Sequence, residues 1–342
     1  MSWPGNGSSQ PPRVVRMSEI TLVEAINMAL AYEMQADDNV IVLGEDVGIN
    51  GGVFRATAGL LQRFGEERVI DTPLAEALIS GMAIGMAAQG LRPVAEIQFM
   101  GFIYPTLDQL VSHASRLRNR TRGRLTCPMV LRAPFGGGIR APEHHSESTE
   151  AMFAHIPGLR VVIPSSPTRA YGLILAAIRN SDPVVFLEPK RIYRLIKQEV
   201  TDNGEALPLD VCFVLRPGTD ITLVSWGAMI HETVKAADTL DEQGVSAEVI
   251  DVATLKPLEM GTILESVQRT GRCVIVHEAA LSGGWGAEIA AQLSEHALLH
   301  LLAPVQRVTG YDTVMPFLKL EGYYMPSVER IVNTVHTALK FS

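Results

Sequence analysis

The sequence contains few cysteines and no long apolar run, and each scarcity excludes a class of protein. Its 342 residues include three cysteines, Cys127, Cys212 and Cys273, which lie far apart without a CxxC pair. We therefore expect neither a disulfide framework nor a cysteine zinc site, and we expect a reducing compartment. Arg92 and Glu96 interrupt the longest apolar stretch before it reaches the roughly 18 residues of a membrane span, so we expect no transmembrane helix.

Basic residues are too few for nucleic acid to be the main partner. Lysine and arginine number 29 against 37 acidic residues, which gives a net charge of −8. One local basic cluster, HASRLRNRTRGR at residues 113–124, departs from this balance. We interpret it as a solvated helix end or a subunit contact.

Apolar residues are abundant by contrast. They make up 47% of the chain against 19% charged residues, so we expect part of the surface to be covered by another subunit. Residues 1–17 are rich in Gly, Ser and Pro without the apolar core of a secretory signal, and we expect a disordered tail. Two arginines there, without an amphipathic pattern, are weak support for import into the mitochondrial matrix. The bacterial cytoplasm is therefore the expected location.

Short apolar runs alternate with helix-length periodic segments, which is typical of an α/β fold. The first series is NVIVLGED, PVAEIQF, PMVLRAPF, LRVVIP and PVVFLEP, and a second series, after a polar segment, is DITLVSWG, SAEVIDV, CVIVHE and VQRVTG. Thr21 and Glu24 predict a capping box at the head of the first helix. We expect two doubly wound α/β domains, at residues 18–204 and 205–342, with ligands at the carboxyl ends of the strands.

One carboxylate stands in an otherwise apolar segment. DTPLAEALISGMAIGMAAQG, residues 71–90, predicts a helix in the protein interior, and Glu76 is its only charged residue after the opening turn. Burying a carboxylate is costly unless it is paired or protonated, although a first-turn charge favoured by the helix dipole is an equally weighted alternative. Ala77, Gly81 and Gly85 recur every four residues and allow close approach of another helix, either within the domain or at a subunit interface.

Two glycine-rich segments are candidate ligand sites. RAPFGGGIRAPEHHSES, residues 132–148, follows a strand-like run, and it places His144 and His145 in one loop after three glycines. Adjacent histidines point in different directions, so we favour proton transfer over metal binding. GGWGAE, residues 283–288, approaches GxGxxG but misses its last glycine, and no GxxxxGK[ST] occurs, so we favour a tight turn over dinucleotide binding.

Further motifs occur in a characteristic order: LGEDVG, GGVFRAT, DTPLAE, AEIQF, HHSES, FLEPKRIYR, VSWG, HEAALSGGWGAEI and GYDTVMP. From about residue 18 to the C-terminus they resemble the beta subunit of the thiamine diphosphate-dependent 2-oxo acid dehydrogenase decarboxylase component. The resemblance implies a transketolase-like pyrimidine-binding domain followed by a transketolase C-terminal domain. It also implies a heterotetramer of two alpha and two beta chains, in which the alpha subunit binds the diphosphate and Mg²⁺ through a GDG motif that this chain lacks.

The resemblance implies roles for particular residues. Glu76 is expected to share a proton with the pyrimidine ring of thiamine diphosphate, and His145 to face the thiazolium ring and assist acyl transfer to a lipoyl group. The residues expected beside the cofactor, besides Glu76, are Glu45, Leu74, Gln98 and Phe102. A potassium ion is implied near the backbone carbonyls of Met129, Ala177, Asn180 and Asp182.

The expected activity is oxidative decarboxylation of a branched-chain 2-oxo acid, 2-oxoisovalerate, with acyl transfer to lipoamide on an acyltransferase core. GGVFRAT, FLEPKRIYR and GYDTVMP resemble branched-chain members of the family most. Pyruvate dehydrogenase and acetoin dehydrogenase beta subunits are the alternatives. A non-catalytic assembly subunit and a nucleotide-binding oxidoreductase are also considered, but Glu76 with His145 argues against the former and the incomplete GGWGAE against the latter.

Overall fold

The structure is a computed structural model that describes residues 17–317 and 319–341. The tail expected over residues 1–17 lies outside these residues, except for Met17, which corrects the expected end of the tail. Met17 is the first residue of β1 (Met17–Thr21), which pairs antiparallel with β8 (Lys197–Thr201). Backbone pairing with a distant strand therefore orders a residue that composition alone assigned to the tail.

The first domain is built on a seven-stranded sheet with the strand order β12-β6-β7-β5-β4-β2-β3. Neighbouring strands pair in parallel, except that β12, from the second half of the chain, pairs antiparallel with β6. The five runs predicted as strands are strands. The sheet comprises β2 (Val40–Gly44), β3 (Val69–Asp71), β4 (Arg92–Glu96), β5 (Val130–Phe135), β6 (Arg160–Val162), β7 (Val184–Pro189) and β12 (Thr254–Lys256).

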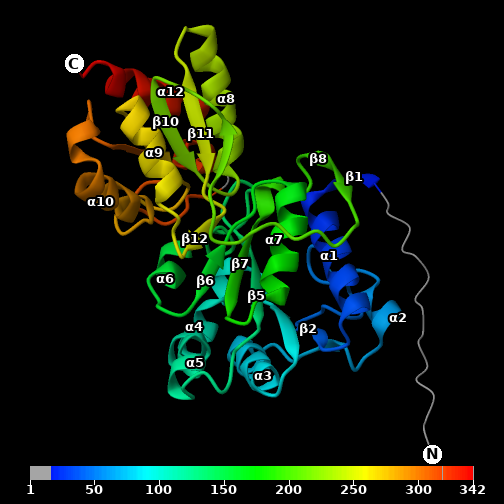
Figure 1. The fold of residues 1–342 in the computed structure, drawn as a ribbon. Coiled ribbons are helices and arrows are strands. Elements are labelled where there is room, and N and C mark those ends of the chain that lie inside the picture. The colour runs from blue at the N-terminus through cyan, green and yellow to red at the C-terminus, as the bar shows by residue number, and fades with distance from the viewer. Residues whose placement is uncertain (1–16, 318, 342) are drawn as a thin grey trace, which may run out of the picture.

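Helices cover both faces of this sheet (Figure 1). Val130 of β5 packs in the core that includes α1 and α7, whereas the next residue, Leu131, packs in the core that includes α3 and α4. Because both faces are buried, the strands read as continuous apolar runs. The helices are α1 (Leu22–Ala36), α2 (Leu60–Phe64), α3 (Glu76–Ala88), α4 (Tyr104–Ser112), α5 (Leu117–Arg120), α6 (Glu150–Ala154) and α7 (Pro167–Arg179), with 3₁₀ turns η1 (Met100–Phe102), η2 (Ala114–Arg116), η3 (Glu143–His145) and η4 (Lys190–Ile192).

The capping box predicted for the first helix is present. The Thr21 backbone N–H donates to Glu24 Oε2 at 2.8 Å, and the Thr21 hydroxyl donates to the same oxygen at 2.7 Å. These bonds hold the pKa of Glu24 below its usual value. The carboxylate therefore satisfies both donors of Thr21, the residue that caps α1.

The second domain has a five-stranded sheet with the order β14-β13-β10-β11-β9, parallel except for β9 on β11. The four predicted runs are strands, again with helices on both faces (Figure 1). The fold is thus α/β throughout, as predicted. The elements are β9 (Phe213–Arg216), β10 (Ile221–Ser225), β11 (Ala247–Asp251), β13 (Cys273–Val276), β14 (Gln306–Val308), α8 (Met229–Glu242), α9 (Gly261–Thr270), α10 (Gly286–His296), η5 (Leu298–His300), α11 (Glu321–Tyr324) and α12 (Val328–Leu339).

The two sheets share parts of the chain. The predicted boundary near residue 205 falls between β8 and β9, but β12 leaves the second half and joins the first sheet. The position near residue 205 therefore separates the two halves of the sequence but not the two sheets, and the domain boundary remains a prediction. Across residues 17–317 and 319–341, every helix is too short or too polar to cross a bilayer.

Candidate active site

The candidate residues gather where β2, β3 and β4 end. Gly44 is in register with Asp71 of β3 and with Glu96 of β4, so the loops after these strands leave from one edge of the sheet. Glu45 follows β2 directly, and Gln98 follows β4, where its amide donates to Asp46 Oδ2 at 3.4 Å. Parallel strands therefore bring together polar residues that are about 50 positions apart in the sequence.

Glu76 lies at the head of α3, which begins at this residue after the turn that follows β3. The prediction that α3 lies in the protein interior is wrong for this chain. Only Ile79, Ser80 and two alanines of the helix are buried, whereas Leu78 is 44% exposed and Leu74, just before the helix, is 72% exposed. The apolar composition of α3 thus reflects an open face as well as a buried one.

The stripe of small residues lies partly on this open face. Ala77 and Gly85 are exposed, and a Cβ atom added at Gly85 would meet no described atom within 4 Å. A Cβ atom at Gly81 would approach only Gln109 Oε1, at 3.6 Å. Close helix packing within the domain therefore does not explain the stripe at Gly85, and the subunit interface stays a prediction.

The acids near Glu76 influence one another. Partial burial raises the pKa of Glu45, and the negative charges of Asp46 and Glu76 raise it further. Glu45 and Glu76 are therefore close enough to interact electrostatically, although they come from different strand-to-helix connections. The group has the composition of a site that can hold or share a proton.

His145 lies among aromatic rings. These rings belong to residues that follow Gln98 in the sequence. Its ring centre is 4.3 Å from that of Phe99 and 5.2 Å from that of Phe102. Burial lowers its pKa, and neighbouring His144 and Lys190 lower it further, so the imidazole is neutral near pH 7. The structure thus brings together Phe102 and His145, for which separate roles were expected.

The 3₁₀ turn that carries His145 packs closely on the turn that carries Phe102. A Cβ atom at Gly101 would collide with the carbonyl oxygen and ring of His144, so only glycine permits this approach. His144 is exposed, and its ring centre is 5.4 Å from that of Phe102. The adjacent histidines therefore occupy different environments, since His144 is exposed and His145 packs among aromatic rings.

Three of the four carbonyls proposed for potassium already accept hydrogen bonds within the chain. Met129 O accepts from Val184 N at 2.9 Å, and Ala177 O accepts from Asn180 N at 3.2 Å. Asn180 O accepts from the Arg92 guanidinium at 3.1 Å, which places a fixed positive charge beside it. A cation would have to share these oxygens, and the potassium site remains a prediction.

A buried ion network joins the strands of the first sheet, and it was not predicted from the sequence. Arg132, on β5, is 1% exposed and donates to both carboxylate oxygens of Glu188, at 2.6 and 2.8 Å, and also to Glu96. The Tyr193 hydroxyl donates to Glu188 Oε2 at 2.5 Å. A charged residue inside each of the runs AEIQF, LRAPF and FLEP was the available signal, because an unpaired charge is too costly to bury.

The GGWGAE segment forms a turn, as favoured. Gly283 and Gly284 precede α10 and Gly286 begins it, and Cβ atoms at Gly284 and Gly286 would lie 2.7 and 2.8 Å from the ring of His277. That ring is buried and stacks on Trp226 with ring centres 5.1 Å apart. The glycines therefore make room for a neighbouring side chain rather than for a nucleotide.

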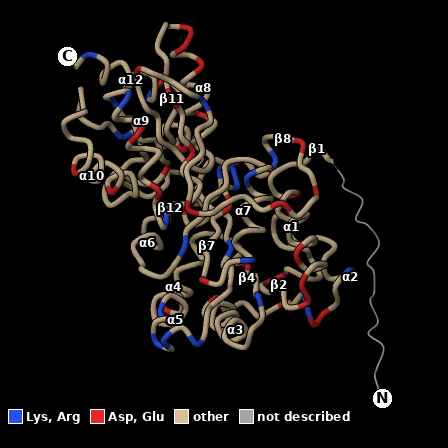
Figure 2. The backbone as a smooth tube through the Cα atoms, in the orientation of Figure 1, with Lys and Arg blue, Asp and Glu red and all other residues tan. Residues whose placement is uncertain are grey.

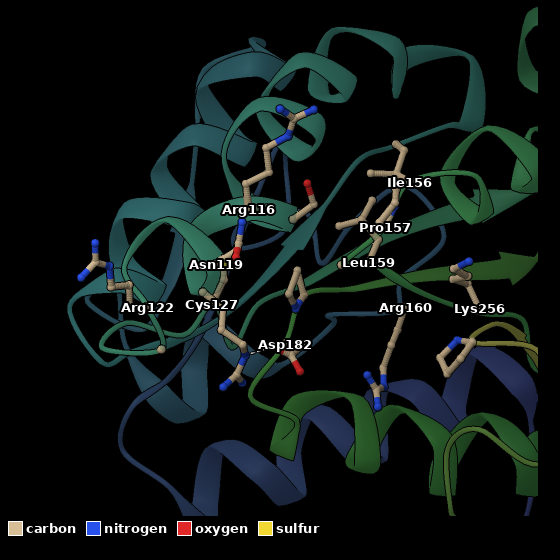
Figure 3. Close-up of a pocket in the computed structure, with 17 residues that line it drawn as sticks. Arg116, Asn119, Arg122, Cys127, Ile156, Pro157, Leu159, Arg160, Asp182 and Lys256 are labelled. Atoms are coloured by element: carbon tan, nitrogen blue, oxygen red, sulfur yellow. Dashed lines mark hydrogen bonds and ion pairs between the residues drawn. The ribbon is translucent and has the colours of Figure 1, made fainter.

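The basic positions of residues 113–124 lie around α5 (Figure 2). They border a surface hollow of about 1060 Å³ (Figure 3). Arg118 is paired with Asp182 at 2.6 Å, and Arg160, across the hollow, is paired with Asp210 at 2.6 Å. Figure 3 shows Arg116 and Arg122 pointing in different directions rather than toward one point. These charges do not form a common anion site, in keeping with a solvated or subunit-facing segment.

Known proteins resemble the chain over nearly its whole length. Residues 18–196 match the family described as "Transketolase, pyrimidine binding domain", and residues 212–331 match "Transketolase, C-terminal domain". A protein of Acholeplasma laidlawii named "Pyruvate dehydrogenase E1 component subunit beta" is 51% identical over 324 residues, which is 95% of this chain and 99% of that protein. A Bacillus subtilis (strain 168) protein of the same name is 47% identical over 325 residues, 95% of this chain and 100% of that protein.

A solved structure shares the fold. "Split gene transketolase, inactive beta4 tetramer" superposes with a TM-score of 0.79 and covers 95% of this chain and 99% of that chain. Its sequence identity is 22%, so the similarity concerns the fold alone.

Proposed function

The chain belongs to the beta-subunit family of thiamine diphosphate-dependent 2-oxo acid dehydrogenases, and we propose that it is the beta subunit of a pyruvate-decarboxylating member. The assignment of pyruvate as the substrate rests on sequence identities of 51% and 47%, each over 95% of the chain, to proteins named as pyruvate dehydrogenase subunits. The expected preference for branched-chain acids finds no support among these relatives. The acetoin alternative stays a prediction.

The residues at the carboxyl edge of the first sheet fit the pyrimidine half of thiamine diphosphate. Thr72 Oγ1 and His145 Nδ1 are buried side-chain atoms without a hydrogen-bond partner in the described part of the chain. Such atoms are costly unless a further group satisfies them. Phe102 offers an aromatic face to a flat ring, and Glu45, Glu76 and Gln98 offer polar contacts at its rim.

Glu76 is proposed to hold a proton at its carboxyl oxygen and to share it with a ring nitrogen of the pyrimidine. Thiamine diphosphate, when bound, supplies the nucleophilic carbon that attacks the keto group and accepts the electrons released with CO₂. Leu74 and the apolar face of α3 exclude water once a partner covers them, which strengthens the hydrogen bond of Glu76. Neutral His145 would exchange a proton with the incoming lipoyl sulfur at one of its ring nitrogens.

An alpha subunit is the proposed cover for the open face of α3, in a heterotetramer of two alpha and two beta chains. This partner would supply the diphosphate and Mg²⁺ ligands, since the chain has no GDG motif. A lipoyl acyltransferase core would receive the acyl group. The relatives compared above are bacterial, and we place the complex in the bacterial cytoplasm.

The test is the ratio of kcat/KM for pyruvate and for 3-methyl-2-oxobutanoate in the complex reconstituted with its alpha subunit. We expect pyruvate to be preferred. The branched acid carries two methyl groups in place of two hydrogens of pyruvate, and each contributes only about 0.8 kcal/mol when buried. We therefore expect the two kcat/KM values to differ roughly 10- to 200-fold. A higher value for the branched acid would overturn the pyruvate assignment while leaving the family intact.

A further inference from the structure

The loop that carries His145 is held by carboxylates from the second domain. The Gly138 N–H donates to Glu321 Oε1 at 2.7 Å, and the Arg140 N–H donates to Glu321 Oε2 at 2.9 Å. Gly137 N–H donates to Glu278 Oε2 at 3.2 Å. Three backbone donors of a single short segment thus converge on two carboxylates that follow them by more than 130 residues.

Both carboxylates are buried, which makes these contacts specific. Glu321 is 5% exposed and Glu278 is 3% exposed. Burial raises the pKa of Glu278, and the neighbouring Lys190 ammonium opposes this effect while it donates to Gly136 O. Glu321 uses its two oxygens for two backbone N–H groups, an arrangement in which hydrogen bonds to a charged acceptor are strong.

The backbone of the loop adopts a conformation suited to this carboxylate. Gly136 and Gly138 have φ angles of 80° and 89°, and Arg140 has a φ of 58° although it is not glycine. A non-glycine residue in the left-handed region is strained and persists where its surroundings hold it. Alternation of left-handed residues turns successive N–H groups toward one anion, and here the anion is Glu321.

The position of His145 depends on this anchoring. The loop is closed at its base, where Gly136 N–H donates to Glu147 O at 3.0 Å. His145 Nδ1 has no hydrogen-bond partner within residues 17–317 and 319–341, so the imidazole is held by ring packing and by the loop itself. Glu321 binds the loop at Gly138 and Arg140, before the histidines, and so restrains the part of the loop that leads to His145.

We propose that Glu321 is a positioning residue. From the second domain, it holds the His145 loop in the conformation needed for acyl transfer. This inference rests on the proposed function for its consequence in catalysis, but the anchoring itself does not. Glu321→Gln replaces one acceptor oxygen by an amide group that faces a backbone N–H. Glu321→Asp keeps the carboxylate and shortens its reach.

The first measurement is hydrogen exchange of the peptide spanning residues 136–147, in the chain and in the reconstituted complex. For Glu321→Gln we expect at least about a tenfold faster exchange there, equivalent to about 1.4 kcal/mol, and partial restoration in Glu321→Asp. Glu329→Gln is the matched control, because Glu329 is an exposed acid in the first turn of α12. Unchanged exchange in Glu321→Gln would overturn the anchoring.

The second measurement compares acyl transfer to a lipoyl domain with decarboxylation reported by an artificial electron acceptor. We expect Glu321→Gln to lower kcat for transfer about tenfold, with decarboxylation within about threefold of the wild type. Equal losses in both assays, or faster exchange with unchanged transfer, would refute the positioning role. If the wild-type complex decarboxylates no 2-oxo acid, the proposed function fails, and hydrogen exchange still decides whether Glu321 anchors the loop.

Discussion

Replacement of Glu76 by glutamine separates a catalytic carboxylate from a helix-end charge. Glu76 is half-buried at the first position of α3, where a negative charge interacts favourably with the helix dipole by about 0.3 to 1 kcal/mol. Glu76→Gln should therefore lower the free energy of unfolding by no more than about 1 kcal/mol. A lost proton relay should lower kcat about 10²- to 10⁴-fold, or about 3 to 5 kcal/mol in the barrier.

The assay is pyruvate decarboxylation in the reconstituted complex, with urea unfolding of the isolated chain beside it. Glu329→Gln is the control, because it changes the same type of side chain in the first turn of α12 at an exposed position. Glu76→Gln should also lower the pKa of Glu45, since the Glu76 charge contributes to raising that pKa. Activity within about tenfold of the wild type would leave only the helix-end role for Glu76.

Other positions give separate tests. His145→Ala should impair transfer to the lipoyl domain more than decarboxylation with an artificial acceptor, and equal losses would contradict its role. Burial raises the pKa of Asp251 to about 7, so its contribution to stability is present at low pH and lost as pH rises through 7. In urea unfolding between pH 4 and 8, Asp251→Asn should remove a decline in the free energy of unfolding on the order of 4 kcal/mol. An unaltered pH dependence would contradict this role of Asp251. Gly85→Leu should leave the isolated chain at least as stable, because leucine favours a helix by about 0.8 kcal/mol over glycine, yet it should prevent assembly with the alpha subunit in size-exclusion chromatography. Normal assembly would remove α3 from the proposed interface.

The strands of both sheets were predictable where apolar runs are long and buried on two faces. The strands without such a run were not predicted, namely β1, β3, β8, β9 and β12. β12 has three residues and pairs with β6, which also has three, so neither carries enough local pattern to reveal a partner about 90 residues away. Such pairing is decided by the tertiary structure rather than by local propensity.

The environment of α3 shows a different limit of sequence reasoning. Its apolar residues correctly indicated a surface that avoids water, but composition does not say whether the cover comes from the same chain. Leu74 and Leu78 are exposed here, and the interior helix that we expected has one open side. Likewise, the carboxylate clamp on Gly138 joins residues 183 positions apart, and no local pattern marks Glu321 as its partner.

The buried Arg132 network bears on why the site residues occupy defined positions. Replacing a buried ion network by well-packed apolar side chains is often neutral or stabilising, so stability alone does not account for it. Its geometry offers another reason, because one guanidinium binds Glu96 at the end of β4 and both oxygens of Glu188 on β7, while it extends from β5 between them. Gln98 and Phe102 follow β4, the His145 loop follows β5, and Lys190 follows β7. A rigid, directional contact thus fixes the three strand ends from which the proposed site is built, which apolar packing of equal energy would leave less well defined.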